Sequence, residues 1–237
     1  MPYLCETGVI PSDSDNGRTS RRSSGRRAGR PATKVLTPEK IVAAALDVIE
    51  VSGDRGLTIS ALAKRLGVAP SALYNHVSSK RDLLILVQDD VIERIDYGCF
   101  ETLPWADAVR QWARSSRDVF ATHGHLIPIY AVIPVTNSRA ILRMYETVAK
   151  GFLAAGWHEG DIVHAIVSIE SFVLGSAMDA NAPEDMYDIG DLSTEFPVFS
   201  SVVAGTREDA SGRADVAFEI GLEGLIAGLE VWRSRQQ

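Results

Sequence analysis

The residues best suited to do chemistry lie in one short stretch after a glycine, where polar side chains surround two apolar anchors, Leu73 and Val77. On a helix these anchors face inward, so the other side chains of the stretch are expected to face outward. Asparagine can form two hydrogen bonds to adenine, tyrosine and histidine can contact phosphate or base edges, and small apolar groups can meet a thymine methyl. The outward-facing set is Pro70, Ser71, Ala72, Tyr74, Asn75 and His76. The chemistry expected of this set is recognition of double-stranded DNA.

Two short helices are expected to position these residues. Thr58 caps the first, which ends at Gly67 where the chain must turn sharply. Pro70 opens the second, over Ser71–His76. A helix, a turn and a helix project the later helix from the surface, short enough to lie in the roughly 12 Å wide major groove. The alternative is a structural three-helix bundle with an incidental polar face.

Further helices precede and follow this pair. Thr37 and Pro38 begin one that stops at Ser52-Gly53, and Ser79–Asp82 is a capping box that starts a long helix toward Tyr97. No strand alternation or internal repeat is visible, so the fold class is all-α. The later elements expected are helices over 104–122, 137–155, 161–180 and 213–232, a short kinked segment between Pro128 and Pro134, and a long mobile loop over 182–211.

A family resemblance rests on the residues of this motif. The run from Thr58 to Val77 reads TISALAKRLGVAPSALYNHV, and SKRDL follows from Ser79 to Leu83. Over residues 37–83 the chain resembles the DNA-binding domain of the TetR family of bacterial repressors. One position departs from the pattern, because many members have Ser or Thr where this chain has Ala69. Its third helix therefore lacks a side-chain cap, a loss of about 1 kcal/mol that Pro70 partly offsets.

The resemblance also implies a role for individual residues. Tyr74 and Lys80 would contact phosphate, and Thr58 and Ser60 would lie over the DNA backbone at the start of the second helix. The residues that would face the bases are Ser71, Ala72, Asn75 and His76.

The second half of the chain contains aromatic and histidine residues that suit a ligand cavity, which is mostly apolar with a few placed polar groups. The candidates are Phe120, His123, His125, Tyr130, Tyr145, Phe152, His164 and Phe172. The alternative is that these side chains fill the core. The runs that begin at Arg143, Gly151 and Phe172 resemble the regulatory domain of the tetracycline-repressor subgroup. This resemblance implies a ligand cavity among the fifth to eighth helical segments, which are the expected helix over 104–122, the kinked segment between Pro128 and Pro134, and the helices over 137–155 and 161–180. It also implies a dimer built from the eighth helix, over 161–180, and the last helix, over 213–232.

Metal binding and catalysis have little support in the sequence. His123 and His125 present two imidazoles, and tetracycline repressors bind their drug with a divalent ion, but no third ligand is spaced to complete a site. No nucleophile elbow, phosphate loop or dinucleotide fingerprint occurs. We therefore expect no metal, no cofactor and no enzymatic activity.

Charge divides the chain into a basic arm and an acidic body. Seven basic residues and no acidic one lie between Arg18 and Lys34, whereas the whole chain has a net charge of -7. Without the arm's seven positive charges and the three negative charges before it, residues 35–237 carry -11. This asymmetry is typical of a protein that touches a polyanion at one end, although a solubilising tail is the alternative. The expected domains are a disordered basic arm over 1–36, a helix-turn-helix domain with its connecting helix over 37–97, and a ligand-binding and dimerisation domain over 98–237.

A glycine stripe in the last helix suggests a homodimer. Gly221, Gly224 and Gly228 are spaced three and four residues apart, and interior helical glycine costs about 1 kcal/mol against alanine, so close approach of another helix would explain them. The apolar residues expected beside this seam are Leu222, Leu225, Ile226 and Leu229, with Ile162, Ile166, Ile169 and Val173 of the eighth helix. The alternative is that the stripe packs within its own subunit.

These observations favour a repressor that binds palindromic operator DNA as a dimer and leaves it when a small-molecule inducer binds. The alternatives are a DNA-binding activator or architectural regulator without a ligand, and a helical small-molecule-binding enzyme or carrier, which the basic arm disfavours. Only two cysteines occur, far apart, which fits a reducing cytoplasm. We expect no signal peptide and no membrane association, because no uninterrupted apolar run of roughly 18 to 20 residues is present.

Overall fold

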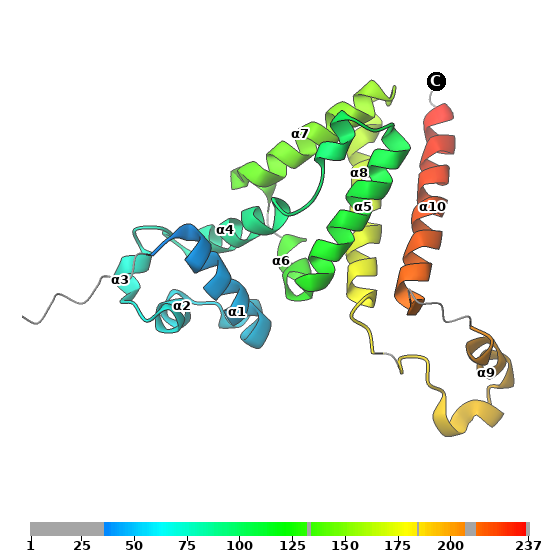
Figure 1. The fold of residues 1–237 in the computed structure, drawn as a ribbon, viewed down its shortest axis with the longest axis horizontal. Helices are drawn as coiled ribbons and strands as arrows, with labels where there is room; N and C mark the ends of the chain where they lie inside the picture. The colour runs from blue at the N-terminus through cyan, green and yellow to red at the C-terminus, as the bar shows by residue number, and fades with distance from the viewer. Residues whose placement is uncertain (1–35, 132–133, 184, 207–211, 236–237) are drawn as a thin grey trace, which may run out of the picture. The chain divides into compact units, whose positions relative to one another are not determined.

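The computed structural model describes residues 36–131, 134–183, 185–206 and 212–235, and within these ranges the chain forms helices and turns without a strand (Figure 1). The all-α prediction is confirmed. The predicted basic arm falls almost wholly outside the described residues. The helices are α1 Pro38–Gly56, α2 Ile59–Leu66, α3 Pro70–Leu73, α4 Lys80–Ile92, α5 Trp105–Thr122, α6 Ile127–Tyr130, α7 Arg139–Ala154, α8 Glu159–Asp179, α9 Pro197–Ala204 and α10 Gly212–Ser234. Four 3-10 segments complete them, η1 Gly98–Glu101, η2 Gly124–Leu126, η3 Val135–Asn137 and η4 Gly190–Thr194.

α1 begins where the sequence signals predict, and α2 both begins and ends there. Thr58 Oγ1 accepts a hydrogen bond from the Ala61 amide at 3.0 Å, which satisfies a free N–H of the first turn of α2. Gly67 ends α2 with a φ of 67°, a left-handed conformation that glycine adopts without strain. α1 runs past the predicted stop to Gly56, although Gly53 within it has a non-helical backbone. Helices α1, α2 and α4 pack together around a buried apolar core.

Two predicted helices are longer than the observed ones. Regular helix in α3 ends at Leu73, and residues 74–76 form a turn in which the His76 amide donates to the Leu73 carbonyl at 2.9 Å. Ala69 provides no side-chain cap to this short helix. α4 ends at Ile92 and does not reach Tyr97, because the chain turns there and the Asp96 amide donates to Ser115 Oγ of α5 at 2.8 Å.

The later helices surround α8. α8 packs along α5 and also contacts α7 and α10, and Figure 1 shows α5, α8 and α10 side by side. A ladder of ion pairs joins α5 to α10, formed by Arg110–Glu223 at 2.7 Å, Arg114–Glu219 at 2.6 Å and Arg117–Asp215 at 2.7 Å. By length and composition alone α8 is apolar enough to cross a membrane. In the described residues α8 contacts three other helices, and one third of this apolar stretch is buried.

Most of the residues predicted to pair two subunits pack inside one subunit, so the prediction is wrong for them. A Cβ on Gly221 would lie 2.5 Å from the Phe172 ring, so this glycine has a packing reason within its own chain. A Cβ on Gly224 or Gly228 would have nothing within 4 Å, so these two positions leave an open surface. The buried members of the predicted seam are Ile162, Ile166, Ile169 and Val173 of α8 and Leu222, Ile226 and Leu229 of α10, and Leu225 is half-buried.

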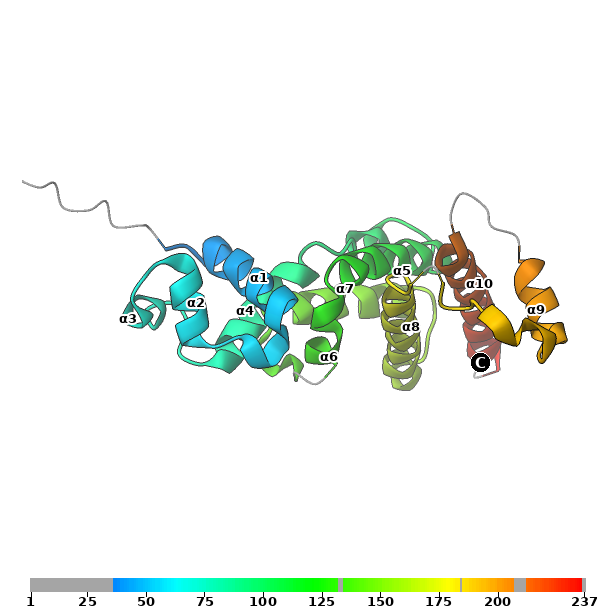
Figure 2. The same ribbon diagram turned by 90° about the horizontal axis from the view of Figure 1, so that it is seen from below.

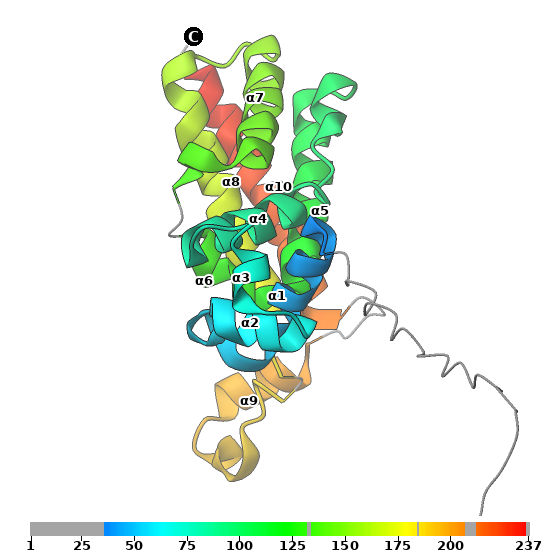
Figure 3. The same cartoon turned by 90° about the vertical axis from the view of Figure 1, so that its left-hand side faces the viewer.

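The long loop expected over 182–211 contains regular structure, which corrects that prediction. η4 and α9 lie within it, and Pro197 opens α9 because the first helical turn needs no backbone donor at that position. No residue of η4 or α9 is buried. Figures 2 and 3 show α9 away from α7 and α8.

Candidate DNA-binding surface and ligand cavity

The face predicted to read DNA is exposed. Leu73 and Val77 are buried against the core, as their role as anchors requires. Tyr74 is 58% exposed, and Asn75 and His76 beside it are exposed as well. Pro70 and Ser71 are also exposed and Ala72 is half-buried. The structure thus brings the six predicted residues to one short surface element.

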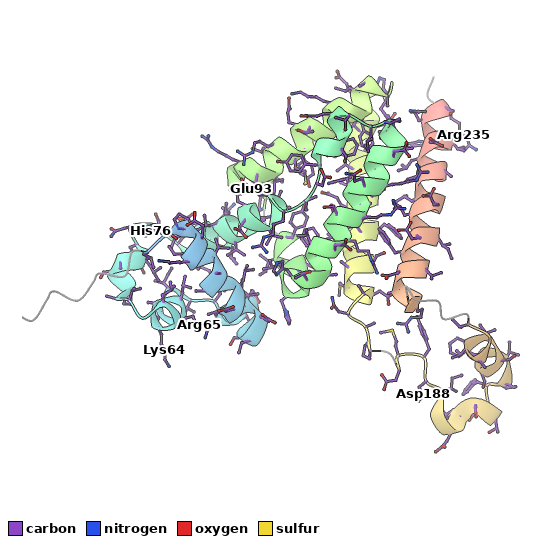
Figure 4. All side chains as sticks on the ribbon, viewed as in Figure 1. Lys64, Arg65, His76, Glu93, Asp188 and Arg235 are labelled. Atoms are coloured by element: carbon purple, nitrogen blue, oxygen red, sulfur yellow. The ribbon has the colours of Figure 1, made fainter. Side chains whose placement is uncertain are left out.

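The start of α2 adds donors next to this element. Ser60 is exposed, and Thr58 keeps its hydroxyl hydrogen free to donate because its oxygen already accepts from the backbone. The N-terminus of a helix favours an anion through its free N–H groups and its dipole. Lys64, labelled in Figure 4, is exposed on the same helix.

Lys80 is placed differently from its neighbours. Its Nζ donates to the Asp54 carbonyl near the end of α1, and the side chain is half-buried. In this arrangement Lys80 ties the start of α4 to the end of α1. A phosphate contact would have to compete with that hydrogen bond.

A small cavity lies among α5, α6, α7 and α8. Its volume is about 10 Å³, roughly what one water molecule needs, whereas drug-sized ligands occupy cavities of about 300 to 1,000 Å³. Two predicted ligand residues, Phe120 and Tyr130, line it, with ring centroids 4.9 Å apart. The other lining residues are Ile95, Trp112, Ser116, Met144, Ile169, Glu170, Val173 and Leu174.

Glu170 in the wall of this cavity forms a hydrogen-bonded cluster with the phenols of Tyr130 and Tyr145. Glu170 Oε1 accepts from the Tyr130 hydroxyl at 3.1 Å, and its two oxygens accept from the Tyr145 hydroxyl at 2.9 and 3.0 Å. Burial raises the pKa of Glu170, and the two hydroxyl donors only partly oppose this. Burial and the adjacent carboxylate also raise the pKa of Tyr130 and of Tyr145, so both phenols stay protonated as donors.

Three other predicted ligand residues, Phe152, His164 and Phe172, are core or surface residues that do not line this cavity. Phe152 is fully buried and packs on the rings of Phe100, Trp105 and Trp157, so it belongs to an aromatic core. His164 is exposed. Phe172 stacks on Phe218 of α10 with centroids 5.5 Å apart. For Phe152 and Phe172 the alternative, that aromatic side chains fill the core, describes the structure, whereas His164 is a surface residue.

His123 and His125 border a different, open cleft between α1 and the η2–α6 segment, with a volume of about 960 Å³. His123 Nε2 lies 3.1 Å from a guanidinium nitrogen of Arg94. Burial lowers the pKa of His123, and the charge of Arg94 lowers it further. Among the described residues no group of three His, Cys, Asp or Glu side chains could hold a metal ion.

Three polar residues of the cavity wall, Trp112, Ser116 and Glu170, were not among the sequence predictions. Trp112 and Ser116 precede Phe120 by eight and four positions, so they share its face of α5. Glu170 stands in the otherwise apolar middle of α8. The sequence did contain one signal for Glu170, which is an isolated acidic residue on an apolar helix. Burying an unpaired carboxylate is costly, so such a residue is expected to have a specific partner or role.

Both halves of the chain match known proteins. Residues 41–87 match the family described as bacterial regulatory proteins, tetR family, and residues 101–233 match the tetracyclin repressor-like C-terminal domain. The class A tetracycline repressor from transposon 1721 of Escherichia coli is 29% identical over 205 residues, which cover 82% of this chain and 90% of that protein. An HTH-type transcriptional regulator of Saccharopolyspora erythraea is 26% identical over 205 residues, 82% of this chain and 85% of that protein.

A solved structure is similar over nearly the same length. Apo ActR from Streptomyces coelicolor has a TM-score of 0.69 and 27% identity, covering 85% of this chain and 98% of its own. ActR in complex with actinorhodin gives a TM-score of 0.65 and 26% identity, covering 84% and 99%. With both of its domains matched, the chain belongs to the TetR family of bacterial transcriptional regulators, which are ligand-responsive repressors that bind DNA through a helix-turn-helix.

Proposed function

We propose that this chain represses transcription in the cytoplasm as a homodimer on a palindromic operator, and that a small molecule in the α5–α8 cavity releases it. The observation that carries the proposal is the combination of an exposed reading face around Tyr74 with a buried polar cavity around Glu170.

The reading face supports specific roles. Asn75 and His76 would contact base edges with Ser71 and Ala72, while Pro70 meets a thymine methyl. Tyr74, Thr58 and Ser60 would position the protein on phosphates. Lys80 would join them only after it leaves the Asp54 carbonyl, so its share of the binding energy is smaller than that of a free lysine.

The dimer proposal is supported by apolar surface on the two longest helices of the later half. On α8, Val163, Val167 and Met178 are 66%, 52% and 61% exposed. On α10, Ile220 and Val231 are 70% and 53% exposed, and Gly224 lies between them. Contiguous exposed apolar patches mark interaction surfaces, and a self-complementary pair of such helices forms a closed two-fold interface. Two reading faces on one dimer would then match the two halves of a palindrome.

α6 offers a physical link between the cavity and the helices of the DNA-binding domain. Its Tyr130 reaches the Glu170 carboxylate, while Ile129 of the same four-residue helix borders α4 together with Leu126. The preceding η2 packs against α1. A ligand that displaces Tyr130 would therefore move a segment in contact with both α1 and α4. Release follows if the ligand binds the displaced form more tightly than the DNA-bound form.

The proposal is tested by selecting operator DNA from a randomised pool and then measuring release with a library of small molecules. ActR, a similar protein, has been crystallised with actinorhodin, so its ligand belongs in the library. We expect a palindromic site, and at least one compound that both raises the melting temperature and weakens operator binding. Selection of no specific site would refute the DNA-binding role. A specific site with no releasing compound in a broad library would leave a ligand-independent regulator as the better explanation.

A further inference from the structure

Glu170 is the only charged side chain among the described residues that line the cavity. Its hydrogen-bond partners are two neutral tyrosine hydroxyls, and no described lysine, arginine or histidine forms an ion pair with it. Buried charges in proteins are generally paired with an opposite charge or a metal. The cavity therefore holds a carboxyl group whose charge, when the group is ionised, no cationic side chain of the described residues balances.

Aromatic rings surround this carboxylate. Trp112, Phe120 and Tyr130 line the cavity, and Tyr145 reaches the same carboxylate from α7. Ring faces attract cations, most strongly when water is excluded. They also stack with flat ligands. The walls and the charge thus favour the same kind of molecule, an aromatic cation.

Two buried groups in the cavity wall have no hydrogen-bond partner. Trp112 Nε1 and Ser116 Oγ belong to residues that are 2% and 5% exposed, and neither atom is paired. Unsatisfied buried donors are uncommon in folded proteins and call for an explanation such as a ligand. A ligand carbonyl or ether oxygen would satisfy them.

A second small cavity shares the Phe120–Tyr130 ring pair with the first. It is also about 10 Å³ in volume, and both rings line it as well as the first. Gln88 lies in its wall, 6% exposed, with both amide atoms unpaired. Parting the two rings would join the cavities and give a flat molecule room between α4 and α8.

We propose that the effector is a protonated amine on a flat aromatic body, with its ammonium group against Glu170 and its rings between Phe120 and Tyr130. The inference rests on the proposed function, because it names the chemical class of the ligand for the same cavity. Glu170 supplies the charge selectivity. Trp112, Ser116 and Gln88 supply hydrogen bonds to polar atoms of the ring system.

The test uses matched probes and the full-length protein without DNA, since aromatic cations also bind DNA. The amines are benzylamine, 2-naphthylmethylamine and 9-anthracenylmethylamine, each compared with the alcohol and the carboxylate of the same ring system. Calorimetric titration gives the affinity of wild type, Glu170→Gln and Glu146→Gln. Glu146 is the control, because it lies on the exposed side of α7 and pairs with Lys150. Circular dichroism confirms that each variant is folded.

For at least one ring size we expect the amine to bind wild type about tenfold or more tightly than its alcohol, because a charge-assisted contact is the stronger one. Glu170→Gln should remove that preference and leave the affinity of the alcohol within about threefold, and Glu146→Gln should keep the preference. The proposal is overturned if alcohols or carboxylates bind as tightly as amines, if no amine binds, or if Glu170→Gln retains the preference. A protein that binds its selected operator but is released by a neutral or anionic compound would refute the amine and leave the repressor function standing.

Discussion

Gly224→Leu is the substitution that tests the proposed dimer surface most directly. Within its own subunit a Cβ at Gly224 meets nothing within 4 Å, so the larger side chain creates no clash in the monomer. Replacing an interior helical glycine there should raise helix stability by up to about 1 kcal/mol. If α10 of a second subunit lies against this position, the leucine instead overpacks the interface, at about 1 to 3 kcal/mol for each copy. The dimer contains two copies, so the expected loss is about 2 to 6 kcal/mol.

That loss corresponds to a dimer dissociation constant raised by roughly 30-fold to 10⁴-fold. Sedimentation velocity over a range of protein concentrations measures it, and circular dichroism checks that helical content is unchanged. Glu230→Leu is the control, because it adds the same side chain at another exposed position of α10. Operator affinity should fall with the dimer, since the second half-site then no longer binds intramolecularly. A Gly224→Leu protein that dimerises as tightly as wild type would place the interface elsewhere, and a wild type that is monomeric at micromolar concentration would refute the dimer.

Three further predictions concern the cavity, the reading face and the arm. Burial raises the pKa of Glu170 above 4.5, so the native state holds this proton more tightly than the unfolded chain, and stability falls as pH rises through the interval between the two values. Calorimetry from pH 4 to 8 should therefore show Glu170→Gln matching wild type at the acid end and melting higher at neutral pH, and a difference independent of pH would contradict this. Asn75→Ala should relax base preference at one position per half-site by about 1 to 3 kcal/mol in a randomised-site selection, whereas Lys80→Ala should weaken all sequences alike; unchanged specificity in Asn75→Ala would remove its role. Deleting residues 1–30 should lower affinity and its salt dependence without changing the preferred sequence, and unchanged binding at low salt would show that the arm does not contact DNA.

The reading face was predictable because its determinants are local. A threonine cap, a left-handed glycine and two apolar anchors fix α2, α3 and the turn between them within twenty residues. The position of Tyr74, Asn75 and His76 on the surface follows from those anchors alone. The length of α3 was not predictable in the same way, because its final residues form a turn whose geometry depends on how Val77 packs into the core.

The cavity was predictable only in part because its residues come from four helices. Aromatic type alone does not distinguish Phe120, which lines the cavity, from Phe152, which fills the core beside Trp105. The difference depends on the neighbouring helix and not on the local pattern. The glycine stripe of α10 is a second example, because helical spacing alone does not distinguish Gly221 from Gly224. Phe172 covers Gly221, whereas Gly224 is open.

The hydrogen bond between Tyr130 and Glu170 couples the chemistry of the ligand to the movement of α6. Two cavities of about 10 Å³ each cannot admit an aromatic ligand, so binding requires that Phe120 and Tyr130 separate. Moving Tyr130 breaks its hydrogen bond to Glu170, and an ammonium group that takes its place restores a partner to the carboxylate with a stronger, charge-assisted contact. Tyr130 belongs to a helix of only four residues, which few backbone hydrogen bonds hold in place. The ligand that best replaces the tyrosine is therefore also the one that most favours displacement of α6, and with it the change at α1 and α4 that would release DNA.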